Sequence, residues 1–371
     1  MTRLLKLALV AAFLAACTPS GPDAPAPEPG VDPGPFSVIL LIGDGAGIGQ
    51  WNAARMAFPE VAVERLPVVG LVGTASASSR ITDSAAGATA FASGVKTYNG
   101  AIGVDTDTAV VETVLERAAA RGKATGLVAT SSITHATPAA FATHVPSRNL
   151  YYAIAAQLAE ADVDVMLGGG RAFFDPAVRP DSADLLAALA RRATVADSTA
   201  ALTALDLSRV DRLVGFIATE HPPAAARRTP SLGAMTEMAL KVLERDTDGF
   251  FLMVEGSQID WRGHDNAPLA ELLPELQDFN GAILAALAFQ ERRPNTLVVV
   301  IADHETGGLA LHYDEMGVFR AHYTTDGHTA GMVPLFAGGP GSTALSGIRE
   351  NDAIGRLLLD MIRRNGPVGA P

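Results

Sequence analysis

The chain has 371 residues, of which 48% are hydrophobic and 18% are charged, so it can bury a large core. Its formal net charge of −12 argues against a nucleic acid as a specific partner, because no basic stripe is present to neutralise phosphates. The negative charge does not exclude a small phosphate substrate, since bound divalent ions would dominate the local field.

The N-terminal residues have the anatomy of an export signal. Arg3 and Lys6 precede an apolar run at residues 7–16 that is too short to span a bilayer. The run ends at Cys17, the only cysteine, in a Leu-Ala-Ala-Cys string that resembles the lipobox of bacterial lipoproteins. An ordinary cleaved signal with an incidental cysteine is the alternative. We expect a signal peptide at residues 1–17 and lipidation of Cys17, which would give a periplasmic or cell-envelope protein held at the membrane only by a lipid anchor.

The rest of the chain alternates between strands and helices. Residues 18–35 are rich in Pro, Gly and Ala, which predicts a semi-extended tether, and no second linker interrupts residues 36–371. Continuous apolar runs predict strands at residues 38–42, 125–129, 163–167, 213–217, 250–254, 296–302 and 333–337. Helix-period stretches include residues 108–121, which have a threonine cap and are followed by Gly122, and residues 231–245. The alternation favours one α/β domain, doubly wound, with a mostly parallel central sheet and helices on both faces.

Three carboxylates closely follow predicted strands. Asp44, Glu255 and Asp303 each lie within two residues of a strand end. In an open parallel sheet the carboxyl ends of the strands form the ligand crevice, so we expect these side chains at one edge of the sheet. The glycines around Asp44 do not fit the dinucleotide-binding fingerprint, because the third glycine would have to fall at Ile48 or Gln50.

Other residues offer metal ligands and a nucleophile. Imidazoles and carboxylates recur close together, in Asp303-His304, in Asp260 with His264, and in the loop that contains His328. Any one of these alone is more often a surface charge or a loop histidine. Imidazole with carboxylate suits zinc, whereas carboxylate with hydroxyl suits magnesium. Ser84 is a candidate nucleophile, because metal coordination can hold a serine as its alkoxide. Together these residues predict a metal-dependent hydrolase.

Five segments closely resemble the alkaline phosphatase family, in the same order along the chain from about residue 37 to residue 337. They are Leu40-Leu-Ile-Gly-Asp-Gly-Ala-Gly, Thr82-Asp-Ser-Ala-Ala-Gly-Ala-Thr-Ala, Thr134-His-Ala-Thr-Pro-Ala-Ala-Phe, Val254-Glu-Gly-Ser-Gln-Ile-Asp and Ala302-Asp-His-Glu-Thr-Gly-Gly. The resemblance implies a catalytic domain at residues 36–371 that hydrolyses small phosphate monoesters to inorganic phosphate and an alcohol. It also implies that Ser84 becomes a covalent phosphoserine and that Arg148 clamps the phosphoryl oxygens, which an arginine fork can do.

The resemblance further implies two Zn²⁺ and one Mg²⁺ as cofactors. The implied ligands are Asp260, His264 and His328 for the first zinc, Asp44, Asp303 and His304 for the second zinc, and Asp44, Thr137 and Glu255 for magnesium. Two zinc ions about 4 Å apart can clamp the attacking and leaving oxygens of an in-line displacement. Three protein ligands for each zinc leave a coordination position open for substrate.

Two residues near these motifs depart from the enterobacterial form of the family. His135 and Trp261 stand where that form has aspartate and lysine, and the pair resembles the small, cold-active marine bacterial members. A neutral imidazole should hold the water shell of the third metal less strongly than a carboxylate does, while Trp261 could equally pack at the rim of the pocket. Only 23 residues separate His304 from His328, so we expect a small or absent crown over an open site.

Other functions fit these residues less well than a monoester hydrolase does. A phosphodiesterase is the alternative within the superfamily, but Glu255, Thr137 and Arg148 together favour a monoester site. A sulfatase would need a Cys-x-Pro-x-Arg type of setting, which Ser84 does not have. A non-catalytic phosphate-scavenging lipoprotein should have lost a ligand or the serine, and none is missing. The sequence does not determine the oligomeric state and allows a homodimer.

Overall fold

The computed structural model describes residues 34–367, which belong to one compact unit. The expected signal peptide, the lipidation of Cys17 and most of the expected tether fall outside the described residues, so they stay predictions. Within residues 34–367, no helix combines the length and the apolar character needed to cross a membrane.

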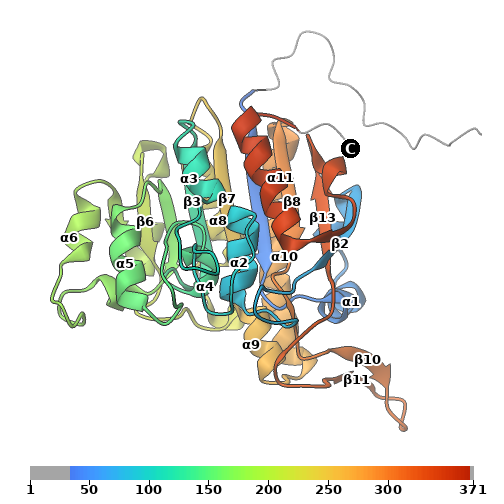
Figure 1. Cartoon of the computed structure of the whole chain (residues 1–371). Coiled ribbons are helices and arrows are strands. Elements are labelled where there is room, and N and C mark those ends of the chain that lie inside the picture. The colour runs from blue at the N-terminus through green and yellow to red at the C-terminus, as the bar shows by residue number, and fades with distance from the viewer. Residues whose placement is uncertain (1–33, 368–371) are drawn as a thin grey trace, which may run out of the picture. The chain divides into compact units, whose positions relative to one another are not determined.

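A ten-stranded sheet crosses the centre of this unit, with helices on both of its faces (Figure 1). Its strands are β1 (Ser37–Gly43), β2 (Val68–Gly73), β3 (Ala124–Ser132), β4 (Val165–Gly169), β5 (Thr194–Ala196), β6 (Leu213–Phe216), β7 (Phe250–Gly256), β8 (Thr296–Ile301), β13 (Val333–Gly338) and β14 (Gly347–Glu350). They lie in the order β14-β2-β13-β8-β1-β7-β3-β4-β6-β5. Every pairing is parallel except the two made by β13, which runs antiparallel to β2 and β8. The predicted α/β fold with a mostly parallel sheet is confirmed.

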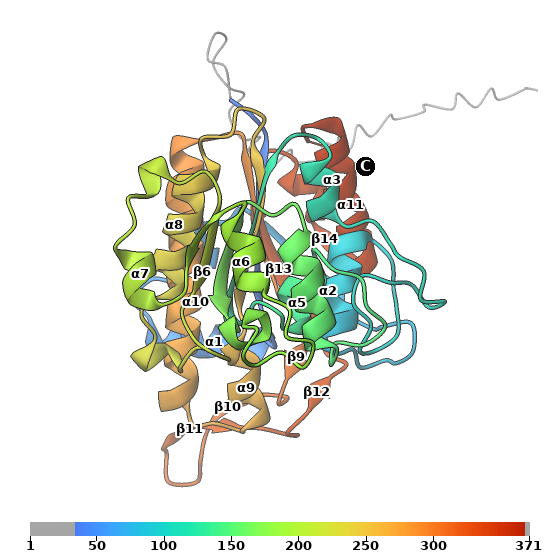
Figure 2. The same cartoon turned by 90° about the vertical axis from the view of Figure 1, so that its left-hand side faces the viewer.

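Two layers of helices flank the sheet. The helices are α1 (Ile48–Ala57), α2 (Ser84–Ser93), α3 (Val114–Ala119), α4 (Ala136–Ala139), α5 (Tyr151–Glu160), α6 (Leu185–Ala190), α7 (Thr199–Thr203), α8 (Leu232–Leu243), α9 (Gln258–His264), α10 (Leu269–Arg292) and α11 (Asn351–Arg364). Figure 2 shows α8 and α10 on one face and α2, α3, α5 and α11 on the other.

The central strands are covered on both faces, and this explains their sequences. Every residue of β1, β7 and β8 is buried, so these strands consist of nearly continuous Val, Ile, Leu and Phe rather than alternating with polar residues. The seven predicted strands are all present close to their expected positions. The sequence did not predict β2, β5 or β14, which are short or partly exposed.

The helix expected at residues 108–121 is shorter than predicted, because α3 begins only at Val114. Thr108 has a left-handed φ of 64°, and Val110 forms an antiparallel bridge with Val104, so this part of the chain is not helical. The N-cap is Thr113, whose hydroxyl accepts from the Glu116 N–H while the Glu116 carboxylate accepts from the Thr113 N–H. This capping box, rather than the earlier threonine, starts the helix.

The segment between His304 and His328 folds into short strands. They are β9 (Glu305–Thr306), β10 (Ala310–Tyr313), β11 (Phe319–His322) and β12 (His328–Thr329). β9 pairs with β12, and β10 pairs with β11 in a hairpin that extends away from the sheet (Figure 1). The β9–β12 pair holds residues from the two ends of this segment side by side.

Candidate metal centre

Neighbouring strands deliver the three carboxylates to one edge of the sheet. β1 lies between β7 and β8, and Asp44, Glu255 and Asp303 at or just beyond their carboxyl ends are fully buried. Backbone hydrogen bonds fix their relative positions, since the Asp44 N–H donates to the Gly256 carbonyl at 3.2 Å and the Gly45 N–H donates to Asp303 Oδ1 at 3.3 Å. The structure therefore brings these carboxylates together, as their places after strands led us to expect.

Three sets of side chains each converge closely enough to hold one metal ion, with candidate ligand atoms within 4.8 Å of one another. They are the first group (Asp260, His264, His328), the second group (Asp44, Asp303, His304) and the third group (Asp44, His135, Glu255). The first two groups contain the residues that the family resemblance assigns to two zinc ions. Asp44 belongs to both the second and the third group.

In the first group, backbone carbonyls fix how the two imidazoles point. His264 Nδ1 lies 2.6 Å from the Asp326 carbonyl, and His328 Nδ1 lies 2.8 Å from the Thr82 carbonyl. A carbonyl only accepts, so each Nδ1 donates and each Nε2 presents its lone pair to the group. The two Nε2 atoms are 3.1 Å apart. Each also lies within 3.5 Å of Asp260 Oδ1, so the three converging lone pairs need a cation between them.

Without a metal ion, a proton would have to occupy this place. The hydrogen bond with Asp260 raises the pKa of His264 to about 9. Burial acts to raise the pKa of Asp260, but the hydrogen bond with His264 and the nearby imidazoles outweigh burial and lower that pKa. These shifts describe a site in which positive charge is strongly favoured.

The second group contains buried carboxylate oxygens that lack partners. Both oxygens of Asp44 and Oδ2 of Asp303 have no hydrogen-bond partner among residues 34–367. His304 Nε2 lies 3.3 Å from Asp44 Oδ1 and 3.4 Å from Asp303 Oδ2, and burial lowers the pKa of His304 to about 4. Burial also raises the pKa of Asp303 to about 6 and raises that of Asp44. Buried, unpaired carboxylates are costly unless a cation binds them, so this donor set fits a metal ion.

The third group, together with Thr137 beside Glu255, offers mainly oxygen donors. Glu255 Oε1 and the Thr137 hydroxyl are buried without hydrogen-bond partners in the described part of the chain, and both Asp44 oxygens are unpaired as well. Burial raises the pKa of Glu255 to about 7, so a cation would also stabilise its ionised form. Carboxylate and hydroxyl oxygens are the donors that Mg²⁺ accepts.

His135, the imidazole of the third group, has a tautomer that favours an indirect role. Its Nε2 lies 3.3 Å from Arg148 Nη2, and a guanidinium can only donate, so Nε2 accepts and Nδ1 keeps the proton. Burial and the charge of Arg148 lower the pKa of His135 to about 3, which keeps the ring neutral. The buried Nδ1 has no partner among the described residues. In this tautomer His135 can donate to water on an ion but cannot bind the ion through Nδ1.

Ser84 lies at the start of α2, next to the second group. Its hydroxyl is buried and lies 3.3 Å from His304 Nε2. The preceding Asp83 is the N-cap and accepts from the Ala86 N–H at 3.0 Å. The first N–H groups of a helix have no partner within the helix, and they point a partial positive charge toward the serine.

Asp83 also holds Arg148 near Ser84. Arg148 Nη1 donates to Asp83 Oδ2 at 3.0 Å, and its side chain keeps about a fifth of its surface exposed. Burial acts to raise the pKa of Asp83, but hydrogen bonds from backbone N–H groups and the charge of Arg148 outweigh burial and lower that pKa. The ion pair therefore fixes a guanidinium beside the serine while leaving part of it accessible.

Sequence reasoning missed several residues of this centre. The partner of Arg148 was not predicted, although Asp83 adjoins the predicted nucleophile. His221, for which the sequence indicates no role, has its ring centre 5.7 Å from that of His135 and 5.0 Å from that of Trp261. Thr306, inside the Asp303-His304-Glu305-Thr306 motif, donates to Asp260. The place of Thr306 in this motif, two residues after His304, is the only signal that could have pointed to it.

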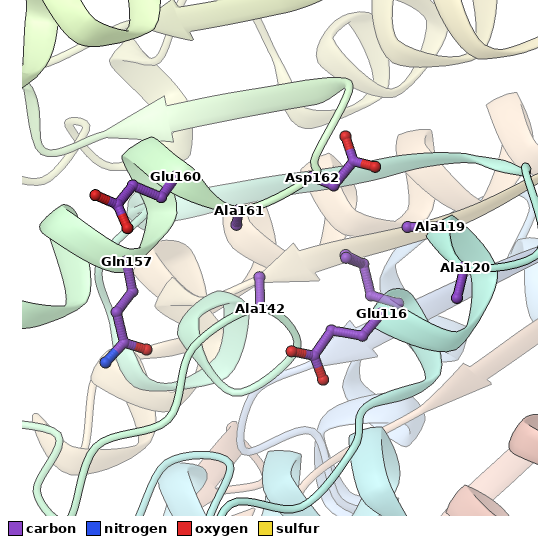
Figure 3. Close-up of a pocket in the computed structure, with 9 residues that line it drawn as sticks. Glu116, Ala119, Ala120, Ala142, Gln157, Glu160, Ala161 and Asp162 are labelled. Atoms are coloured by element: carbon purple, nitrogen blue, oxygen red, sulfur yellow. The ribbon is translucent and has the colours of Figure 1, made fainter.

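A separate cavity of about 490 Å³ lies between α3 and α5 (Figure 3). Glu116, Gln157 and Asp162 line it together with several alanines, and no member of the three donor groups does. The chemistry of the donor groups therefore lies outside this cavity.

Comparison with known proteins places the chain among phosphatases. The sequence model of the family described as alkaline phosphatase matches residues 37–321. The chain is 40% identical to alkaline phosphatase 3 of Bacillus subtilis over 336 residues, which cover 84% of this chain and 71% of that protein. The solved alkaline phosphatase of the Antarctic bacterium TAB5 is 39% identical, with a TM-score of 0.83, over 89% of this chain and 98% of that chain. Two variants of that enzyme, with one histidine replaced by glutamate or aspartate, are described as having magnesium bound in the M3 site.

Proposed function

The chain belongs to the alkaline phosphatase family and is a phosphate monoester hydrolase, and we propose that it acts through a covalent phosphoserine at Ser84 with two zinc ions and one magnesium ion. One observation carries this proposal. The buried Ser84 hydroxyl lies 3.3 Å from His304 Nε2, the atom that also faces the unpaired carboxylates of the second group. A nucleophile thus adjoins a donor set that fits a metal ion, and a guanidinium is held close by on Asp83.

The chemistry of the donors supports the choice of ions. The first and second groups mix imidazole with carboxylate, which suits zinc, and each supplies three protein ligands. The oxygens of Asp44, Glu255 and Thr137 suit magnesium. When bound, the ions would neutralise the buried carboxylates, lower the pKa of the Ser84 hydroxyl and polarise the phosphoryl oxygens.

The residues of the chain supply the rest of the reaction. The Ser84 oxygen attacks phosphorus in line with the ester oxygen, the bond from phosphorus to the alcohol oxygen breaks, and the alcohol leaves. Water then attacks phosphorus, the bond to the Ser84 oxygen breaks, and inorganic phosphate leaves. Arg148 can bind two phosphoryl oxygens with its fork in both steps, while the N-terminal N–H groups of α2 favour the negative charge.

A comparison of monoester and diester hydrolysis tests this substrate class. A second ester group removes one charged oxygen that Arg148 could bind, so kcat/KM should be about 10²-fold higher for p-nitrophenyl phosphate than for bis-p-nitrophenyl phosphate. Arg148→Ala should lower kcat/KM for the monoester more than kcat/KM for the diester, so the ratio of the two values should become smaller. A higher kcat/KM for the diester in the wild-type enzyme would favour the phosphodiesterase alternative.

His135→Asp should tighten the magnesium site. A carboxylate would hold the water shell of the ion more strongly than the neutral imidazole does, so we expect the dissociation constant for Mg²⁺ to fall about tenfold. The TAB5 variants with a carboxylate in place of one histidine have magnesium bound, which supports this expectation. Turnover should slow if product release limits it. The measurement is a magnesium titration of activity together with the metal content of the purified enzyme.

A matched control separates this effect from the added charge. His312 lies exposed on β10, away from the donor groups, so His312→Asp makes the same change in side chain without touching the centre. Its magnesium dependence should equal that of the wild type. If His135→Asp behaves like this control, His135 does not contact the hydration shell of the ion.

A further inference from the structure

Thr306 occupies the point where the first and second groups meet. It is fully buried in β9, two residues after His304 of the second group. Its backbone pairs with that of His328 of the first group through the β9–β12 pair. The Thr306 carbonyl accepts from Gln50 Nε2 at 2.8 Å, which further fixes this part of the backbone. The residue therefore adjoins both donor groups through the main chain alone.

The Thr306 hydroxyl also joins the two groups. Its Oγ1 lies 2.5 Å from Asp260 Oδ1 and 3.2 Å from His304 Nδ1. A hydroxyl has one proton, and a carboxylate only accepts, so Thr306 donates to Asp260. Its lone pairs are then left to accept from the His304 Nδ1–H. This arrangement places the proton of the neutral His304 ring on Nδ1 and leaves the Nε2 lone pair free to bind a metal ion.

The surrounding backbone leaves the Thr306 side chain little freedom. A Cβ atom at Gly45 would lie 2.7 Å from Thr306 Oγ1, and one at Gly263 would lie 2.8 Å from Thr306 Cγ2. Both glycines therefore leave space for this side chain. Gly45 follows β1 beside Asp44, and Gly263 lies in α9 between Asp260 and His264. The segments that carry ligands of both groups thus close around one threonine.

We propose that Thr306 is a positioning residue that couples the two zinc groups, because its single hydroxyl orients Asp260 in the first and fixes the tautomer of His304 in the second. The inference rests on the proposed function in that both groups bind zinc. The inference adds that neither group reaches its full affinity for zinc without the hydroxyl of Thr306. Partners that orient a ligand in this way are typically worth 10- to 100-fold in metal affinity.

The test compares three variants of the full chain. Thr306→Val keeps the shape of the side chain but removes the hydroxyl, and we expect it to weaken zinc binding at both groups by about 10- to 100-fold. Thr306→Ser keeps the hydroxyl and should restore most of this affinity. Thr296→Val is the matched control, since Thr296 is buried in β8 and its hydroxyl has no hydrogen-bond partner among residues 34–367. Zinc affinity is measured by competition with a chromophoric chelator, and cobalt absorption reports the geometry of each group.

A second measurement does not depend on metal binding. Nitrogen NMR of the metal-free protein should show His304 protonated on Nδ1 in the wild type and in Thr306→Ser. In Thr306→Val the proton should move toward Nε2, where Asp44 and Asp303 oxygens can accept it. If the wild type binds no zinc and Thr306→Val still shows this tautomer shift, the proposed function is refuted and the positioning role of Thr306 stands. An unchanged tautomer, or a loss of affinity confined to one group, would overturn the coupling.

Discussion

Replacing Ser84 by alanine should lower turnover by on the order of 10³-fold or more, with only slow direct hydrolysis remaining. The substitution removes the oxygen that attacks phosphorus, so no covalent intermediate can form. α2 should stay intact, because its N-cap is Asp83 and alanine is a good helix former. The variant should still bind metal ions and inorganic phosphate, since the donor groups and Arg148 are unchanged.

Trapping the intermediate identifies the nucleophile directly. Acid quenching of the wild-type enzyme with labelled substrate should leave the label on the peptide that contains Ser84. Two in-line displacements also predict retention of configuration at phosphorus. Ser93→Ala is a suitable control, because Ser93 lies buried at the other end of α2 and donates to the Thr89 carbonyl rather than to the site. Label on another residue, or inversion at phosphorus, would show that the nucleophile has been misassigned.

Removing the metal ions should abolish activity altogether. The second and third groups would then keep several buried carboxylate oxygens without partners, and the serine would lose its activation. Zinc should restore most of the activity to the metal-free protein, and magnesium should add a smaller increment. Analysis of purified, active protein should find zinc; its absence would refute the assignment of the first two groups.

Reloading the metal-free protein with zinc and magnesium should depend on pH in a defined direction. The raised pKa values of about 9 for His264 and about 7 for Glu255 mean that protons compete with metal ions at these ligands. The apparent affinity for the metal ions should therefore rise with pH. For magnesium at the third group it should rise as the pH passes through about 7, and for zinc at the first group it should rise up to a pH of about 9. Calorimetry in buffers of different ionisation enthalpy measures the protons released. No proton release between pH 6 and 8 would mean that these ligands are already deprotonated without metal.

The sequence predicted the core of the fold because burial on both faces leaves a plain signal. β1, β7 and β8 consist almost wholly of large apolar residues, and each has a carboxylate within two residues of its carboxyl end. The direction of β13 carried no such signal, because an apolar strand has the same composition whether it is parallel or antiparallel. The predicted start of α3 was wrong because two threonines could each cap a helix. Only Thr113 is followed by the glutamate that completes a capping box.

The metal ligands could be predicted from their residue types. The residues that act through contacts with distant parts of the chain were missed. Aspartate and histidine after strands could be recognised from their own chemistry. The contacts of Asp83 with Arg148 and of Thr306 with Asp260 join residues 65 and 46 positions apart, and neither threonine nor a second aspartate is distinctive by itself. The tautomers of His264 and His328 depend on carbonyls at Asp326 and Thr82, which any residue would supply.

The spread of the ligands along the chain also governs when the centre can assemble. Gly45 and Asp303, which share a hydrogen bond within the metal centre, are 258 positions apart along the chain. The first group further requires His328, close to the end of the fold. A chain that is cut or released by the ribosome before His328 therefore lacks at least one ligand of the first group. Incomplete products of synthesis or proteolysis cannot form the full centre, and only chains that extend past His328 carry every ligand.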